Sequence, residues 1–226
     1  MDGPVASGKN AVGSLLAQKL GYRFIDTGAM YRALTWLALE RGLDLEDEAA
    51  LAELAGTARI TLCPLNDGGS LVQVEGKDVS TEIVRGRVER VVSLVARVKG
   101  VRQVLVERQR RMAQGGRVVM AGRDIGTVVL PQAQLKLYLV ASAEERACRR
   151  YHELMDRGEP ADYSDVLADL VRRDRIDSQR SDSPLKPAPD AHIIETHGLG
   201  IEEVVAQILG IIEAECRSST TPASPL

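Results

Sequence analysis

The chain has 226 residues, a formal net charge of −3 and 44% hydrophobic residues. This length predicts one large domain or a core with small insertions, and with one Phe and one Trp the core must be mostly aliphatic. The near-neutral charge gives no support for non-specific binding to nucleic acid. We expect neither a signal peptide nor a membrane-spanning segment.

Cysteines and histidines are few and scattered along the chain. The cysteines have neither the spacing of a zinc site nor that of a disulfide framework, which favours reduced thiols in a cytoplasmic protein. The histidines favour surface or strand-end positions over metal ligation, so we expect no dedicated protein metal site. These residues are Cys63, Cys148, Cys216, His152, His192 and His197.

The first ten residues contain a phosphate-binding pattern, G-x-x-x-x-G-K, which runs from Gly3 through Gly8 to Lys9. Apolar residues at helical spacing follow it, so a helix would aim its positive N-terminus at the phosphates. The alternative is a Gly/Ser-rich turn without a ligand. The residue after the lysine is normally Ser or Thr, which helps to place Mg²⁺, but here it is Asn10. Only two residues precede Gly3, where a buried strand is expected to lead into the loop.

Two predicted strands bring polar side chains to one edge of a sheet. They span 21–25 and 116–120, and each leads into a turn that contains glycine. Because ligands bind at the carboxyl edge of open α/β sheets, we expect the residues that follow these strands to lie together. Those residues are Thr27, Tyr31, Arg32, Arg123 and Asp124. Further core strands are predicted over 135–140 and 192–195.

The segment between the first two strands changes character and is predicted to be an insertion. We expect a helix over 44–58, then a hairpin of 60–62 and 71–74 around a turn at 66–69. A long helical stretch follows over 84–112, as two helices broken near Gly100. It contains Ser93, Arg102 and many other arginines, most of which a solvated basic face explains.

The last third of the chain is predicted to be mainly helical. Ser142 and Glu145 form a capping box, and the helix that they open carries Arg146, Arg149 and Arg150 on one face. A mobile turn at 156–160 leads to a helix over 166–179. Its stripe of Arg173, Asp177 and Arg180 is equally well explained as a self-paired surface. A closing helix follows at 201–212, and a Ser/Thr/Pro-rich tail at 217–226 is predicted to be disordered.

Together these segments resemble bacterial cytidylate (CMP) kinase, a family in the nucleoside monophosphate kinase group of P-loop proteins. The resemblance covers essentially the whole chain up to the tail. The run Gly122–Val129 is close to diagnostic for this family, whereas the P-loop alone is not. The matching segments are Gly3–Lys9, Asp26–Arg32, Gly76–Ser80, Gly122–Val129, Ala141–Arg150, Arg173–Arg180 and Pro184–Pro187.

The resemblance implies an α/β fold: a P-loop NTPase-type parallel sheet core flanked by helices, an inserted CMP-binding subdomain containing a small antiparallel hairpin, and a short lid. It implies five parallel strands, the first of which is missing here. Residues 1–226 would form a single domain. Its parts would be the core at 1–30, 116–148 and 164–216, the CMP-binding insertion at about 31–115, the lid at about 149–163 and the tail at about 217–226.

The resemblance also implies an activity. It is phosphoryl transfer from ATP to CMP or dCMP in pyrimidine nucleotide metabolism, with Mg²⁺ accompanying ATP. We expect a cytoplasmic monomer without nucleic-acid or membrane partners. The implied catalytic residues are Lys9, Arg123, Arg150 and Arg173. The implied ATP-binding residues are Gly3, Pro4, Val5, Ala6, Ser7, Gly8, Lys9, Asn10 and Ala11. The implied CMP-binding residues are Thr27, Tyr31, Arg32, Ser93, Arg102, Arg123, Asp124, Arg173, Asp177 and Arg180.

The sequence departs from the family on the metal side of the site. The family usually has a hydroxyl residue within two positions after the lysine, and here those positions are Asn10 and Ala11. It often has a carboxylate where this chain has Ala121. Metal placement would then depend on ATP oxygens, water and Asp124 or Asp2. With the missing first strand, these departures leave open an alternative, a nucleotide-binding protein of the same fold with impaired or lost catalysis.

Overall fold

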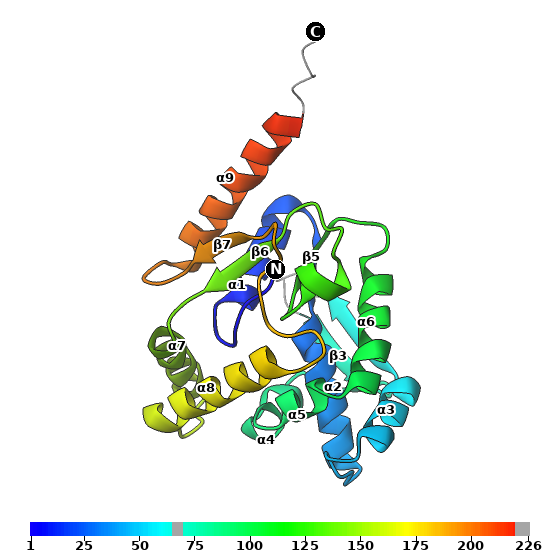
Figure 1. The fold of residues 1–226 in the computed structure, drawn as a ribbon. Coiled ribbons are helices and arrows are strands. Elements are labelled where there is room, and N and C mark those ends of the chain that lie inside the picture. The colour runs from blue at the N-terminus through cyan, green and yellow to red at the C-terminus, as the bar shows by residue number, and fades with distance from the viewer. Residues whose placement is uncertain (65–69, 220–226) are drawn as a thin grey trace.

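A computed structural model describes residues 1–64 and 70–219, and Figure 1 shows helices arranged around short parallel strands. The strands are β1 (Arg23–Asp26), β2 (Ile60–Pro64), β3 (Ser70–Val74), β4 (Lys77–Asp78), β5 (Val118–Ala121), β6 (Leu137–Val140) and β7 (His192–Glu195). The helices are α1 (Lys9–Leu20), α2 (Thr27–Glu40), α3 (Glu48–Thr57), α4 (Gly86–Glu89), α5 (Val92–Ala96), α6 (Lys99–Ala113), α7 (Ala143–Asp156), α8 (Tyr163–Gln179) and α9 (Ile201–Ser219), with short helical turns η1 (Glu82–Val84) and η2 (Ile125–Val129).

Two pairs of parallel strands form the core, and the first two residues of the chain lie between them. β1 pairs with β5, and β6 pairs with β7. The Asp2 amide donates to the Leu137 carbonyl at 2.7 Å, and the Asp2 carbonyl accepts from the Leu139 amide at 2.8 Å. On the other side, the Met1 carbonyl accepts from the Gly122 amide at 3.0 Å. The expected parallel core is confirmed, and Met1 and Asp2 occupy the position of the short central strand.

Apolar packing holds this core to its first and last helices. Buried side chains from α1, β6, β7 and α9 form one cluster, as expected for amphipathic helices that cover a parallel sheet. Leu139 on β6 and Val205 and Ile208 on α9 have no exposed surface. α9 packs here as far as Ile212, and its C-terminal end extends away from the body in Figure 1.

The predicted insertion surrounds α2 and forms the largest apolar cluster. Ala33, Leu34 and Ala38 on α2 are fully buried because α3, α5, η1 and β3 all pack against this helix. The predicted hairpin is confirmed as the antiparallel pair β2–β3, to which β4 adds a short third strand. The predicted turn at 66–69 lies outside the described residues. In Figure 1 this part of the molecule lies on the side opposite β7 and α9.

The prediction of a helix break near Gly100 is confirmed, but the prediction of two helices is wrong. The segment folds as η1, α4, α5 and α6, and Gly100 lies in the first turn of α6. The break comes at Val98, whose ψ of 117° is extended. A Cβ on Gly100 would lie 2.6 Å from the Ala52 Cβ. This glycine therefore lets α6 pack closely against α3 rather than ending a helix.

Other helix boundaries differ from expectation because of local interactions. α8 begins at Tyr163 because the Asp162 carboxylate accepts hydrogen bonds from the Ser164 and Asp165 amides at 2.8 and 3.2 Å. The predicted disordered tail is wrong for residues 217–219, where α9 continues to its end. An ion pair of 3.4 Å between Arg217 and Glu213 supports this last turn, and residues 220–226 lie outside the described part. Across 1–64 and 70–219, no helix is both long and apolar enough to cross a bilayer.

We predict that Gly100→Ala lowers the free energy of unfolding. The overlap with Ala52 costs about 1–3 kcal/mol, which exceeds the gain in helix propensity of about 1 kcal/mol. Urea unfolding followed by circular dichroism measures the difference, and adding Ala52→Gly should relieve the overlap.

Gly210 provides the matched control for this substitution. It lies within α9, and a Cβ there would have no neighbour within 4 Å. Gly210→Ala should therefore be neutral or stabilising. If both glycine variants change the free energy of unfolding equally, close packing of α6 against α3 does not explain why residue 100 is glycine.

Candidate active site

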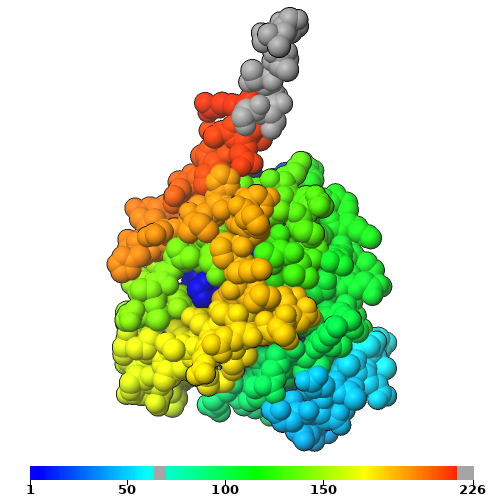
Figure 2. Space-filling view, in the orientation of Figure 1, coloured from blue at the N-terminus to red at the C-terminus, as the bar shows by residue number. Residues whose placement is uncertain are grey.

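A cavity of about 240 Å³ opens at the carboxyl ends of β1 and β5. Its lining comes from the loop before α1, the start of α2, the insertion, the loop after β5, and helices α7 and α8. Figure 2 shows N-terminal residues, in blue, at the bottom of a hollow framed by α8 in yellow and by the orange segment that leads to β7. Segments from the whole length of the chain therefore meet at one site.

The loop between Met1 and α1 has the backbone shape of a phosphate cradle. Gly3 has a φ of 147°, and a Cβ there would lie 2.3 Å from the Leu139 carbonyl oxygen, so only glycine fits. Ala6 and Gly8 also have positive φ values, of 57° and 87°. Because Gly8 precedes α1 without a side-chain cap, the first-turn amides of α1 keep their hydrogen-bonding capacity for a ligand.

Lys9 folds back over this loop and is buried. Its Nζ donates to the Pro4 carbonyl and, at 3.1 Å, to the Ser7 hydroxyl. Burial lowers the pKa of Lys9 well below its usual value, and the Arg123 guanidinium lowers it further. A bound phosphate would counter both effects, because its negative charge favours the ammonium form.

Asp26 joins the loop to the start of α2. One carboxylate oxygen accepts from the Gly28 amide at 2.9 Å, and the other accepts from Asn10 at 2.8 Å and Arg32 at 2.7 Å. Burial opposes ionisation of Asp26, but Arg32 and these hydrogen bonds outweigh it and lower its pKa. Asp26 therefore stays ionised at neutral pH and holds Arg32 at the wall of the cavity.

A buried ion pair between Arg102 and Asp124 forms the deep end of the cavity. Both side chains are less than a tenth exposed. Arg102 also lies over the Tyr31 ring, 5.9 Å from its centroid. Burial raises the pKa of Tyr31 to about 12, so its hydroxyl is neutral and available as a hydrogen-bond donor. This end combines polar groups with a flat aromatic face.

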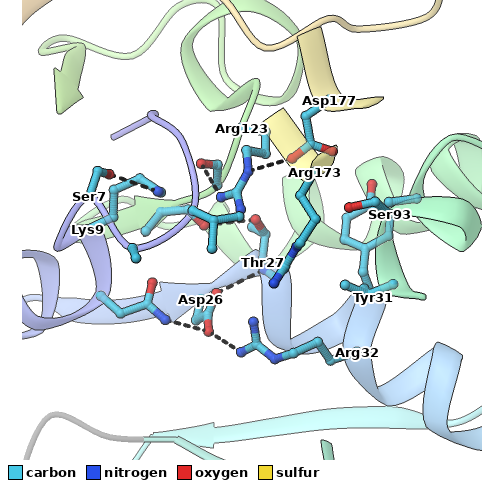
Figure 3. Close-up of a pocket in the computed structure, with 18 of the residues that line it drawn as sticks. Ser7, Lys9, Asp26, Thr27, Tyr31, Arg32, Ser93, Arg123, Arg173 and Asp177 are labelled. Carbon is cyan, nitrogen blue, oxygen red and sulfur yellow. Dashed lines mark hydrogen bonds and ion pairs between the residues drawn. The ribbon is translucent and has the colours of Figure 1, made fainter. Parts of the chain in front are cut away.

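Two more arginines extend from the loop after β5 and from α8 into the centre of the cavity. Arg123 Nε donates to Asp177 at 3.0 Å, which orients its guanidinium. Figure 3 shows Lys9, Arg32, Arg123 and Arg173 converging on the same space. Several arginines keep a buried nitrogen without a hydrogen-bond partner among the described residues: Arg32 Nε, Arg102 Nε, Arg173 Nε and Arg180 Nη2. Buried donors of this kind are normally satisfied, so they indicate room for an acceptor-rich ligand.

One acidic residue of the insertion faces the arginines of α7 and α8. Glu89 Oε2 lies 2.6 Å from Arg150 Nη2 and 3.6 Å from Arg173 Nη1. Arg150 also pairs with Glu153 of its own helix at 2.8 Å. Ion pairs of Glu89 with Arg150 and Arg173 thus connect the insertion to α7 and α8 across the cavity.

The structure brings most of the predicted site residues together in the cavity lining. These are Val5, Ala6, Ser7, Gly8, Lys9, Asn10, Ala11, Thr27, Tyr31, Arg32, Ser93, Arg102, Arg123, Asp124, Arg150, Arg173, Asp177 and Arg180. Gly3 and Pro4 belong to the same loop without lining the cavity. The role of each residue toward a ligand remains a prediction.

Sequence reasoning missed four residues that shape the site. Asp26 directly follows β1 and could have been found by the same sheet-edge argument as Thr27. Arg146 donates to the Val5 carbonyl at 3.1 Å and pairs with Asp174 at 2.7 Å, so it supports the loop from behind. Glu89 and Glu153 gave no sequence signal, because only the tertiary fold brings them to the cavity.

The residues around the loop fit a hydrated Mg²⁺ ion, but not through the carboxylates that the sequence indicated. Both Asp2 oxygens accept backbone amides, from Ile125 and Gly126, each at 2.7 Å, and Asp124 is paired with Arg102. Within 1–64 and 70–219, no group of three or more His, Cys, Asp or Glu residues could hold a metal ion. Asp26 is likewise engaged, by Gly28, Asn10 and Arg32, but Asn10 lies beside the phosphate cradle, and its amide oxygen suits an ion that keeps several waters.

Comparisons with known proteins agree on one family. The family model for cytidylate kinase matches residues 1–214. The cytidylate kinase of Geobacillus thermodenitrificans is 52% identical over 213 residues, which is 94% of this chain and 94% of that protein. Those of Bacillus velezensis and Bacillus subtilis are 48% and 45% identical over 217 residues, which is 96% of each chain in both cases.

We predict that Asp124→Ala lowers the free energy of unfolding by about 3–5 kcal/mol, because it leaves Arg102 buried without its partner. Replacing both residues, as in Asp124→Ala with Arg102→Met, should recover much of the loss. Urea unfolding of the ligand-free protein tests both variants. Glu107→Ala serves as control, because it breaks an exposed ion pair with Arg111 and should cost about 1 kcal/mol or less. Equal losses in Asp124→Ala and Glu107→Ala would contradict a buried charge pair.

Proposed function

The chain belongs to the cytidylate kinase family, and from this premise we propose that it transfers a phosphoryl group from ATP to CMP or dCMP, giving ADP and CDP or dCDP. Such a reaction needs a phosphate cradle for the donor and an anion site for the acceptor, open to one another. One observation supports the proposal above others: four arginines, each with a buried nitrogen that has no partner within 1–64 and 70–219, line a cavity that continues into the phosphate-binding loop. We place the enzyme in the cytoplasm as part of the same proposal.

The chemistry explains why the site is rich in arginine. Phosphoryl transfer between two phosphates depends mainly on alignment and charge neutralisation, with little need for a general base. A monoester phosphate loses its second proton near pKa ~6, so the acceptor is already an anion at neutral pH. Arginine binds phosphate oxygens in pairs through its planar fork, which a lysine cannot do.

Each cation has a part in this proposal. Lys9 and the loop amides hold the outer phosphates of ATP. Arg32, Arg123 and Tyr31 hold the phosphate of CMP, and the Asp26 and Asp177 carboxylates orient the two arginines. Arg150 and Arg173 approach from the α7–α8 side and neutralise charge as the phosphoryl group moves.

The deep end of the cavity would hold the nucleoside. Cytosine presents a ring carbonyl and an amine, which require both donors and acceptors. Thr27, Ser93, Arg102, Asp124 and Arg180 offer these groups from five different segments. Arg173 and Asp177 would then lie near the ribose. The Asp124 carboxylate, which is paired with Arg102, is the natural acceptor for the cytosine amine.

Mg²⁺ would accompany ATP and, when bound, neutralise charge on its phosphates. Asn10 would offer it an amide oxygen, with phosphate oxygens and water completing its shell. Asn10 Nδ2 already donates to Asp26, which fixes the Asn10 side chain beside the loop.

A coupled assay of ADP release with CMP, dCMP, UMP and AMP tests the proposal. We expect turnover with CMP and dCMP and little with the other two. Tight CMP binding without turnover would instead favour the alternative, a binding protein of the same fold that has lost catalysis.

Lys9→Ala should reduce the transfer rate by at least 10²–10³, or roughly 2.7–4 kcal/mol, because one charge-assisted donor to the phosphates is lost. CMP binding should stay nearly unchanged, since Lys9 serves the donor side. Steady-state kinetics with calorimetry of CMP binding separates the two effects. Lys19→Ala, on the exposed end of the same helix, is the control. A loss of CMP affinity as large as the loss of rate would refute this role of Lys9.

Asn10→Ser should shift half-activation to lower free Mg²⁺ and raise the rate by about tenfold at most, or roughly 1.4 kcal/mol. The shorter hydroxyl side chain would offer the ion an oxygen from the first turn of α1. Activity against free Mg²⁺ measures this shift. Asn10→Ala is the control, since it also breaks the bond to Asp26 but adds no oxygen. If both variants give the wild-type Mg²⁺ curve, the ion does not depend on position 10.

A further inference from the structure

Glu89 is an acidic residue in a cavity that is otherwise suited to anions. It ends α4 in the insertion, and the two arginines it contacts come from α7 and α8 on the other side of the cavity. The side chains of Glu89, Arg150 and Arg173 are 16%, 12% and 8% exposed, so these contacts are largely shielded from solvent. Shielded ion pairs are much less screened by salt than surface pairs. The contacts of Glu89 with Arg150 and Arg173 therefore attract the insertion to α7 and α8 more strongly than surface pairs would.

Glu89 also interacts electrostatically with a third arginine, Arg32. Burial opposes the charge on Arg32, and Asp26 followed by Glu89 restores it, which raises the pKa of Arg32. Glu89 therefore lies within electrostatic reach of an arginine on the neighbouring helix α2 as well as the two it touches. A carboxylate surrounded by three arginines occupies the kind of environment that a phosphate group requires.

We propose that Glu89 is a positioning residue that stands in for a substrate phosphate while the cavity contains no nucleotide. It holds Arg150 and Arg173 across the cavity, and it releases them to phosphate oxygens when nucleotide binds. No covalent bond changes in this exchange; one anion replaces another on the same guanidinium groups. The inference rests on the proposed function, because it assumes that the incoming anion is a nucleotide phosphate.

This role has a distinct energetic signature. Because Glu89 competes with phosphate for the arginines, it weakens nucleotide binding. Because it also ties the insertion to α7 and α8, it restrains those helices in the free protein. Removing its charge should therefore tighten nucleotide binding and loosen the empty protein at the same time. A residue that merely stabilised the fold would not produce both changes.

The test compares Glu89→Gln with Glu153→Gln. Both substitutions keep side-chain size, remove one negative charge from the cavity lining and break an ion pair with Arg150. Only Glu89 bridges the cavity, whereas Glu153 lies one turn from Arg150 on the same helix. The comparison therefore removes the general effect of charge near an anionic ligand.

Calorimetry with CMP and steady-state kinetics provide the first measurement. We expect Glu89→Gln to bind CMP about fivefold or more tightly than both wild type and Glu153→Gln, and to lower KM without raising kcat. Hydrogen exchange of the ligand-free proteins provides the second measurement. We expect faster exchange in α7 and α8 for Glu89→Gln alone.

The outcomes separate this inference from the proposed function. The proposal that phosphate replaces Glu89 on the arginines would be refuted by equal CMP affinities in the two variants, or by weaker CMP binding in Glu89→Gln than in wild type. If wild type binds no CMP, the proposed function fails, while hydrogen exchange still tests the bridge: unchanged exchange in Glu89→Gln would show that Glu89 restrains nothing.

Discussion

The carboxylate of Asp2 joins the two loops on which the candidate site depends. Its oxygens accept the Ile125 and Gly126 amides, while its backbone pairs with β6 and leads directly into the phosphate-binding loop. An unpaired buried carboxylate is costly, so these amides must lie where Asp2 needs them. The loop after β5, which presents Arg123 and Asp124, is thereby fixed relative to the cradle that contains Lys9. A shift of either loop would break two charge-assisted hydrogen bonds.

A second constraint is the balance of charge within the cavity. Six arginines and Lys9 face a space of about 240 Å³, and isolated cations this close together would repel one another strongly. The protein meets this constraint with carboxylates of its own. Asp26 holds Arg32, Asp124 holds Arg102, Asp177 holds Arg123, and Glu89 with Glu153 holds Arg150. The cavity can therefore exist without ligand while still presenting buried donors to one.

The parts that sequence predicted well are those encoded in local patterns. The loop from Gly3 to Lys9 and the polar residues after β1 and β5 follow from strand, glycine and helix signals, and the fold brings them to one sheet edge. The hairpin β2–β3 was likewise evident from alternation. The number and ends of the helices over 84–112 were not, because Val98 and Gly100 are determined by packing against neighbouring elements. Glu89 was missed for a related reason: its partners lie 61 and 84 positions further along the chain, in other helices. Ion pairs between residues so far apart in the chain produce no periodic pattern in the sequence.

The two ends of the cavity differ in how firmly they hold their cations, and this bears on what the site selects. On the donor side, the Lys9 ammonium donates hydrogen bonds to two neutral groups of its own loop, so a phosphate improves its surroundings. On the acceptor side, the arginines are already paired with carboxylates, and a ligand must compete with those pairs. A neutral nucleoside cannot do so, because it brings no charge to replace Glu89 or to share Arg32 with Asp26. A phosphate brings two negative charges and three oxygens, and it can satisfy the unpartnered arginine nitrogens at the same time. The acceptor side thus favours nucleotides over nucleosides through the phosphate itself, and the deep end around Asp124 is left to distinguish one base from another.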